Sequence, residues 1–354
     1  MANCPQGFPL CLAIATQRKR LAYAGFIACL AIAARQAALP HCGLRFTLSK
    51  KQPQLIWVSL LQYVPIGIML RIPDLVRRQR NRNGHNMKYS ASTIIYNLDR
   101  IDPATRAAIL ASPKYPKWFS QKPDAMLRLD GSTKVIKGNK LGFRTAILYL
   151  APYNISGFNV CPMAQIAQCH EGCLFTSGRG AMKSVMMSRL RKTLFFLQFQ
   201  AEAIAMIKRE VANAEKHAAK HGYVLLVRLN GTSDIRWENY GIMQAYPGVQ
   251  FYDYTKLANR KHIPTNYDLT FSYSGVPEFQ TQVRLAIAAG MRLAVVFRNR
   301  AMVESMIDAG ASFQGLPIVD GDDTDVRHID PQHSAVALYA KGLAKHDQSG
   351  FVVG

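Results

Sequence analysis

From Met87 onward, short apolar runs of strand length alternate with segments that have the spacing of helices. We predict six strands, at Thr145–Leu150, Tyr223–Leu229, Val249–Tyr254, Asp268–Tyr273, Arg292–Phe297 and Leu316–Val319. Runs this continuously apolar are typical of strands that are covered on both faces. Helices between consecutive strands act as crossover connections, which join parallel strands. The sequence therefore predicts an α/β fold built on a parallel sheet.

The helical segments end at glycines, as helices commonly do. They are Ser184–His221, Pro277–Ala289 and Ala301–Ala309, followed by Gly222, Gly290 and Gly310. The first is long enough for two helices, although no break is visible in it. About six strand–helix units in about 210 residues favour a partial TIM-barrel-like domain, because a full eightfold barrel needs about 250 residues. A doubly wound sheet is the alternative, but no Gly-x-Gly-x-x-Gly turn follows the first strand.

Charge divides the chain near Met87. Residues 1–86 carry twelve Lys and Arg against one acidic residue, whereas the whole chain of 354 residues has a net charge of +22. We therefore expect a basic, apolar N-terminal extension over 1–86 and an α/β barrel-like domain over 87–354. Such an excess of positive charge indicates an anionic partner such as nucleic acid, but it says nothing about the fold.

Two apolar runs in the extension have basic flanks, Leu21–Ala34 and Leu55–Leu70. Both are shorter than the roughly 20 residues that a membrane-spanning helix needs. Three interpretations remain open. Residues 21–70 contact a membrane or act as an export signal; the extension is a soluble basic domain; or Met87 begins the functional protein, and the extension is poorly structured or an over-extended reading frame.

The sharpest candidate site follows the first predicted strand, in a loop over residues 157–180. Function in parallel α/β folds gathers where strands end. Three cysteines, Cys161, Cys169 and Cys173, fall within thirteen residues of this loop, and no other cysteine occurs after Met87. Because an odd number of thiols leaves one unpaired, and because a reducing compartment disfavours disulfides, we expect a metal centre or, as the alternative, ordinary packing.

Two metals compete for these thiols. Zinc would need His170 as its fourth ligand, directly beside Cys169, and the spacing matches no common zinc pattern. Three thiolates instead suit a [4Fe–4S] cluster with one open iron, because cysteine thiolates are the usual ligands of such clusters. We therefore expect an iron–sulfur cluster, with zinc as the alternative.

Several segments carry a resemblance to a known family. They are CPMAQIAQCHEGC, NGTSD, FYDYTK, YDLTFSYS, IVDGDDTDVRHID and AKGLAKHDQSGFVV. From about Leu141 to its C-terminus, the chain resembles a poorly characterised phage-encoded family of three-cysteine proteins, known mainly by a gene-product number. The resemblance implies a phage or mobile-element protein in the cytoplasm of the host bacterial cell.

More distantly, the arrangement resembles radical S-adenosylmethionine enzymes, which place a three-cysteine loop after strand one of a partial barrel. Their small-residue segment after strand two receives the cofactor. By this resemblance, S-adenosylmethionine would lie against the following residues: Asn230, Gly231, Thr232, Ser233 and Asp234. The cysteine spacing here, seven residues and then three, differs from the commonest pattern of that superfamily.

Cations gather at the start of the helix that follows the cysteine loop. They are Arg179, Lys183, Arg189, Arg191 and Lys192. Next to a helix N-terminus, they predict a site for phosphate or the nucleic-acid backbone. Four aspartates in residues 320–325 are a weaker candidate for a divalent cation.

Two functions follow from these features. The first is a phage protein with an iron–sulfur cluster on the three cysteines, acting as a radical-type enzyme. The second is a nucleic-acid-binding, replication-associated accessory protein with a structural zinc or no metal. The sequence leaves both open.

Overall fold

The computed structural model describes residues 96–131 and 133–354. The predicted extension over 1–86 lies outside the described residues, and so does the segment 21–70, for which membrane contact is one of the three interpretations. Within the described ranges, no helix is both long and apolar enough to cross a bilayer.

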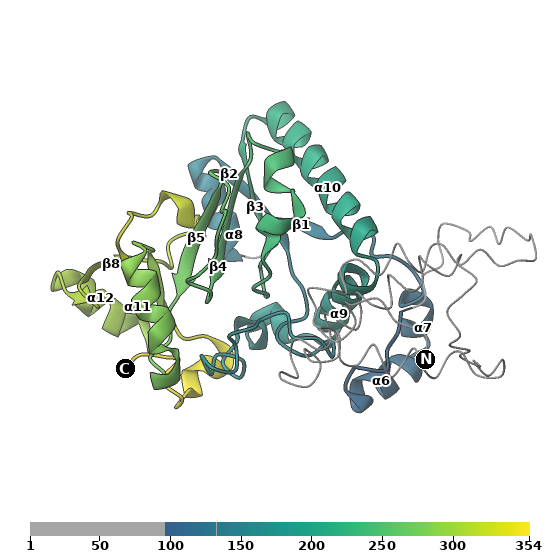
Figure 1. The fold of residues 1–354 in the computed structure, drawn as a ribbon, viewed down its shortest axis with the longest axis horizontal. Coiled ribbons are helices and arrows are strands. Elements are labelled where there is room, and N and C mark those ends of the chain that lie inside the picture. Colours follow the sequence, from purple (N-terminus) through teal and green to yellow (C-terminus); the bar gives the residue numbers. More distant parts are fainter. Residues whose placement is uncertain (1–95, 132) are drawn as a thin grey trace, which may run out of the picture. The chain divides into compact units, whose positions relative to one another are not determined.

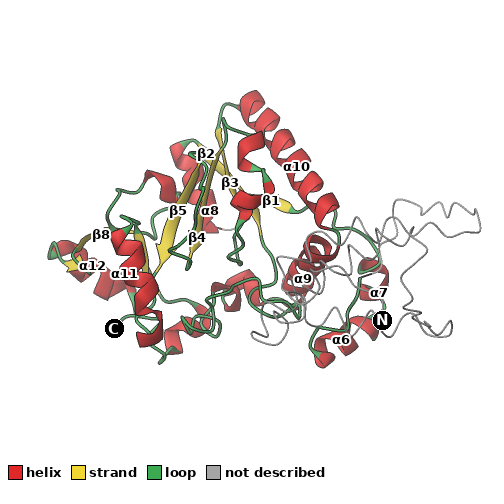
Figure 2. Cartoon of the chain, viewed as in Figure 1, coloured by secondary structure: helices red, strands yellow, loops and turns green. Residues whose placement is uncertain are grey.

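A single nine-stranded sheet organises these residues, with strand order β1-β2-β3-β4-β5-β6-β9-β8-β7 (Figures 1 and 2). The strands are β1 Leu127–Leu129, β2 Phe143–Leu148, β3 Val224–Arg228, β4 Gln250–Thr255, β5 Tyr267–Ser272, β6 Leu293–Phe297, β7 Ser312–Phe313, β8 Leu316–Asp320 and β9 Ala335–Tyr339. Neighbouring strands from β2 to β8 in this order run parallel. Only the outer strands β1 and β7 run antiparallel to their neighbours.

The predicted α/β class is therefore confirmed, and each of the six predicted strands is present. Strands β2 to β6 lie side by side in chain order, as in a barrel and without the reversal of a doubly wound sheet. The sheet nevertheless ends at β1 and β7, which pair with each other nowhere in the described residues. The pairing is that of an open, mostly parallel sheet.

The helices connect the strands and cover the sheet. They are α6 Pro103–Leu110, α7 Tyr115–Trp118, α8 Thr133–Lys137, α9 Lys183–Gln198, α10 Gln200–His221, α11 Gln280–Ala288 and α12 Arg300–Asp308. The long predicted helix is indeed two, because Phe199 leaves the helical region with φ −132° and ψ 54°. At α6, the carboxylate of Asp102 accepts a hydrogen bond from the Thr105 backbone N–H at 2.8 Å and so caps the helix N-terminus.

One face of the sheet packs against helices and forms the main apolar core. Leu148 and Val227 lie in one cluster with Leu194 of α9 and Ile207 of α10. A second cluster joins strands β5 and β6 to α11 and α12. In Figure 1, α10 runs along the β3 side of the sheet, and α11 and α12 lie near its β8 end. Burial of these apolar side chains supplies the main stabilisation of the fold.

The opposite face is partly polar and is covered by the connection between β8 and β9. Side chains of consecutive strand residues point to opposite faces, so Tyr252 faces away from its neighbour Phe251, which packs in the helix-covered core. Tyr252 instead clusters with Leu226 and with Val326 of the connection. Arg228, at the end of β3, forms a buried ion pair with Asp325 of the same connection.

Candidate functional site

The cysteine loop lies over the carboxyl edge of the sheet, where several strand ends hold it. The backbone N–H of Asp234, after β3, donates to the carbonyl of Val160 at 2.8 Å. The hydroxyl of Ser274, after β5, donates to the carbonyl of Ala167 at 2.9 Å. Loops that follow different strands therefore fix the cysteine loop. We call this edge of the sheet, formed by the carboxyl ends of the strands and the loops that follow them, the rim.

The chain's C-terminal segment supports the other end of the loop. Gly172 packs so closely against Ala344 and Phe351 that an added Cβ would lie 3.3 Å from the Ala344 Cα. The backbone N–H of Leu343 donates to the Thr176 hydroxyl at 3.2 Å. A parallel bridge between Phe297 and Val353 ties the segment to β6.

The three thiols are free and partly buried. The Cys161 sulfur accepts a hydrogen bond from the Tyr153 backbone N–H at 3.4 Å and donates to the Thr232 carbonyl at 3.7 Å. The Cys169 thiol donates to the Ala164 carbonyl at 3.8 Å. Cys161 therefore contacts the loop after β3, where the sequence predicts a cofactor.

Burial raises the pKa of the Cys161 thiol to about 12, and the nearby Cys173, Asp234 and Cys169 add to the increase. Burial likewise raises the pKa of Cys173, to which Cys169 contributes. Each thiol is thus within electrostatic range of the other two. A raised pKa keeps the Cys161 and Cys173 thiols in their protonated form at neutral pH, and protonated thiols are weak nucleophiles.

Lys256 is a buried cation within electrostatic range of all three thiols. Burial lowers the pKa of its ammonium group, and the opposing influences are those of Cys169, Asp234, Cys173 and Cys161. Its Nζ donates to the Ser272 carbonyl and hydroxyl at 3.0 and 2.9 Å. The ammonium also lies 5.0 Å from the ring centre of Phe351. A positive charge held here favours negative charge on the sulfurs.

The thiols do not converge on one point. In the ranges 96–131 and 133–354, no three His, Cys, Asp or Glu side chains lie close enough to hold a single metal ion. His170 uses its ring Nδ1 against the Ala164 carbonyl at 3.3 Å. The Cys3His zinc arrangement considered from the sequence is therefore not assembled among these side chains.

The segment 230–234 is a tightly bonded turn. The Asn230 side-chain oxygen accepts from the Ser233 hydroxyl, the Ile235 backbone N–H and the Trp237 ring N–H, all within 3.0 Å. The Thr232 hydroxyl donates to the Leu150 carbonyl at 2.5 Å. These side chains hold the turn against the start of the cysteine loop, so a cofactor here would meet mainly backbone.

Asp234 and Gly231 have clear internal roles in this turn. The Asp234 carboxylate accepts from the Lys256 backbone N–H at 2.8 Å and pairs with Arg260 at 3.3 Å. A Cβ on Gly231 would lie 2.7 Å from the Leu148 carbonyl oxygen. Gly231 is therefore required for close approach of two backbones rather than for an unusual turn conformation.

The five predicted anion-binding cations do not share one exposed face. Arg179 and Lys183 are exposed, whereas Arg189 and Arg191 are buried. Arg191 pairs with Asp124 at 3.1 Å and lies 3.8 Å from the Trp118 ring centre. Lys192 donates to the Met126 carbonyl at 2.7 Å. Two cations of the five thus hold the segment before β1, and two face solvent.

The aspartate-rich segment is occupied by the protein's own cations. Asp322 pairs with Lys341 at 2.7 Å and with Lys134 at 3.3 Å, and Asp325 pairs with Arg228. These ion pairs fasten the connection before β9 over the polar face of the sheet. Asp322 and Asp325 therefore serve the fold.

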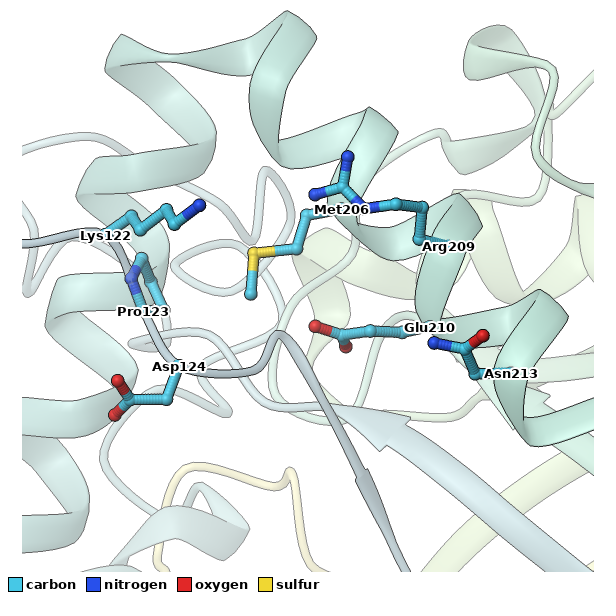
Figure 3. A pocket seen from close by; sticks show the side chains of 7 residues that line it. All are labelled: Lys122, Pro123, Asp124, Met206, Arg209, Glu210 and Asn213. Atoms are coloured by element: carbon cyan, nitrogen blue, oxygen red, sulfur yellow. The ribbon is translucent and has the colours of Figure 1, made fainter. Parts of the chain in front are cut away.

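A hollow of about 330 Å³ lies apart from the rim, between α10 and the segment before β1 (Figure 3). Glu210 points into it from α10 (Figure 3). Its carboxylate accepts from the Met126 backbone N–H at 2.9 Å and from the Leu127 backbone N–H at 2.6 Å. Of the two acids that line the hollow, Glu210 is thus used to position β1, and Asp124 pairs with Arg191.

Sequence reasoning identified the cysteines and the loop after β3 but gave no role to Lys256 or Phe351. Lys256 directly follows β4, so its strand-end position was a usable signal. Phe351 lies far along the chain in an irregular segment, and only the folded structure brings it to Lys256.

Together, the sheet order and the rim define a mostly parallel α/β protein with a three-cysteine loop over the carboxyl ends of its strands. The chain belongs to the Gene product 88 family, a phage gene-product family whose pattern matches residues 125–354. This match confirms the phage-family resemblance and spans every strand of the described residues as well as the cysteine loop. No curated protein and no solved structure matches the chain, and the comparisons give no support to the resemblance to radical S-adenosylmethionine enzymes.

Proposed function

We propose that this phage protein binds a [4Fe–4S] cluster through Cys161, Cys169 and Cys173. The observation that carries the proposal is that three free thiols of one loop influence one another and the same buried ammonium, Lys256. Ordinary packing does not require such a gathering, because structural cysteines behave as small apolar residues that can lie anywhere in a core.

A cluster and a single zinc ion need different spacings of their cysteine ligands. Zinc draws all its sulfur ligands to about 2.3 Å from one centre, and no such convergence exists among the described residues. In a four-iron cluster each cysteine binds a different iron, so the sulfurs remain farther apart. Three thiols that influence one another electrostatically, in a region where no three ligands meet around one ion, are compatible with the wider sulfur spacing of a cluster.

The charges around the thiols also suit a cluster. Raised thiol pKa values disfavour a nucleophilic role at neutral pH. A metal overcomes this obstacle, because coordination displaces the thiol proton. Lys256 would then offset the negative charge of the thiolates. A bound cluster would supply one-electron transfer.

Three cysteines leave one iron of the cluster without a protein ligand, and a cofactor can bind there. We propose a radical-type enzyme with S-adenosylmethionine as that cofactor, as the distant sequence resemblance implies. The turn 230–234 would receive it mainly through backbone groups, since Asn230 and Asp234 use their side chains internally. The host cytoplasm, a reducing compartment, suits such a cluster.

Anaerobic purification of the full chain, followed by iron and acid-labile sulfide analysis, tests the proposal. We expect about four irons and four sulfides per chain, with visible charge-transfer absorption that dithionite bleaches. Single Cys→Ala variants at 161, 169 and 173 should lose most of the iron. A matched control replaces the four cysteines of the extension, Cys4, Cys11, Cys29 and Cys42, and should retain it. Stoichiometric zinc without sulfide would refute the cluster.

The alternative function is that of a nucleic-acid-binding accessory protein. Fewer cations are exposed for contact with nucleic acid than the sequence indicates. Around α9, only Arg179 and Lys183 of the five predicted cations are exposed. This function predicts that affinity for DNA or RNA falls steeply with salt and that an Arg179→Gln, Lys183→Gln double variant binds more weakly. Salt-independent binding, or none, would remove it.

A further inference from the structure

Arg189 differs from every other buried arginine in the described ranges. These arginines are Arg189, Arg191, Arg228, Arg292 and Arg327. Four of them pair with carboxylates, which are Asp124, Asp325, Asp268 and Asp330 respectively. Arg189 pairs with none of the described carboxylates, and its Nε and Nη1 are buried without a hydrogen-bond partner. The other four also leave Nε unbonded, so the missing carboxylate is what sets Arg189 apart.

The unpaired guanidinium lies beside the cysteine loop. Its central carbon is 5.2 Å from the ring centre of Tyr149, the residue that directly follows β2. It is also within electrostatic range of Cys173: burial raises the pKa of that thiol, and the Arg189 charge partly opposes the increase. The cation therefore faces the rim where the strand ends meet the cysteines.

A buried charge without a partner destabilises a fold. The guanidinium fork matches the two oxygens of a carboxylate or the oxygens of a phosphate, and such pairs are among the strongest polar contacts. We propose that Arg189 binds the oxyanion of a small molecule, a phosphate or a carboxylate, at the rim beside Cys173. We assign this site from the burial of Arg189 and from its lack of a carboxylate partner among the described residues. The site does not depend on the proposed cluster.

The ligand must be small. Only 8% of the Arg189 surface is exposed, so a single oxyanion can reach the guanidinium, but the rigid backbone of a duplex cannot. Tyr149 provides an adjacent aromatic face. The site is therefore distinct from the exposed pair Arg179 and Lys183, which is the remaining candidate for contact with nucleic acid.

Thermal unfolding of the full chain with added anions tests this site. Inorganic phosphate and sodium acetate are titrated separately at constant ionic strength, with chloride as the baseline, so that the two arms distinguish a phosphate from a carboxylate. We expect at least one to raise the Tm of the wild type in a saturable way, because a ligand that binds only the folded state stabilises it. The increase should vanish in Arg189→Met and persist in Arg284→Met, a variant at an exposed arginine of α11.

The same variants separate a ligand-binding role from a structural one. Without added anion, Arg189→Met should unfold at a higher temperature than the wild type, because the variant removes an unpaired buried charge. Arg191→Met should unfold at a lower temperature, since it leaves the contacts to Asp124 and Trp118 unmade. A decrease in Tm for Arg189→Met like that for Arg191→Met would overturn the proposal.

Two further outcomes are decisive. Equal stabilisation of all variants by phosphate and acetate would mean non-specific anion effects and no site. Repeating the titration on the Cys161→Ala, Cys169→Ala, Cys173→Ala triple variant separates the anion site at Arg189 from the proposed cluster. A saturable, Arg189-dependent increase there supports the anion site even if no iron is found. Iron loss in Arg189→Met without any anion effect would make Arg189 a counter-charge to the cluster and overturn the anion site.

Discussion

Replacing Gly231 with alanine tests whether the turn after β3 sets the position of the cysteine loop. A Cβ at this residue would lie 2.7 Å from both Ile147 Cγ2 and the Leu148 carbonyl oxygen, and 2.8 Å from Tyr149 Cδ1. Real Cβ atoms do not approach so closely, so either the turn or the end of β2 must move. The Gly231 N–H also donates to the Leu148 carbonyl at 3.0 Å, and this hydrogen bond would lengthen.

The expected loss of stability follows from the cost of overpacking. Adding a methyl group to a well-packed site costs about 1–3 kcal/mol. For a domain of this size, each kcal/mol lowers the Tm by about 2–4 °C, so Gly231→Ala should unfold about 2–12 °C below the wild type. Because Thr232 contacts Cys161 directly, the same movement should also reduce the iron bound per chain.

The assay is thermal unfolding by circular dichroism, together with iron analysis of the same samples. The matched control is Gly248→Ala, where the nearest atom, Glu215 Oε1, lies 3.8 Å from the added Cβ and φ is not positive. That variant should unfold within about 1 °C of the wild type, as surface substitutions usually do. Equal Tm values for the two variants would refute the packing argument. A stable Gly231→Ala that has lost only its iron would instead make Gly231 a ligand-contact residue.

Three further perturbations follow from the structure. Asp325→Asn should lower stability by up to about 3–5 kcal/mol, because it removes the nearer of the two carboxylates that pair with the buried Arg228, Asp325 and Asp253, whereas the exposed Asp323→Asn should change urea unfolding little. Phe351→Ala should cost about 3–5 kcal/mol in the same assay and speed the loss of iron in air, because its ring packs beside Lys256 and the cysteine loop; unchanged iron retention would contradict this support. Burial lowers the pKa of Lys192 to about 8, so the unfolded state binds more protons above that pH and stability should rise as the pH increases from about 8 to 10. Lys192→Met should remove this rise, and identical pH profiles of the variant and the wild type would refute the shift.

The strands could be predicted because each is a continuous apolar run whose burial does not depend on one particular partner. The exceptions are informative. Strand β9 was missed although Ala335–Tyr339 is apolar, because a five-residue run after a polar segment also fits a loop. Strand β9 pairs with β6 and β8 and lies between them. This pairing depends on contacts between residues far apart in the chain, which the local sequence does not specify. Strand β1 has three residues, too few for any periodicity.

The cysteine loop could be predicted because its signal is local, with three rare residues in one segment after a strand. Its supports could not, since the C-terminal segment that contacts Gly172 is about 170 residues away in the chain. The turn 230–234 was identified as a segment, but its side-chain roles were not predicted. The Asn230 side chain can bind either a ligand or its own turn, and the positions of the Ile235 and Trp237 N–H groups decide between them. The sequence does not give these positions.

Arg189 and Arg191 have different environments that could not be predicted from the sequence. They are two residues apart on α9 and identical in type, and the sequence grouped them in one anion-binding set. Two residues correspond to about 200° around a helix, so the side chains leave on nearly opposite sides. Arg191 meets Trp118 and Asp124, so its charge serves the fold. Arg189 meets the strand-end rim, where no described carboxylate pairs with it. Only the tertiary structure distinguishes Arg191, which stabilises the fold, from Arg189, which we propose binds a ligand. The opposite Tm shifts expected for Arg189→Met and Arg191→Met measure that difference directly.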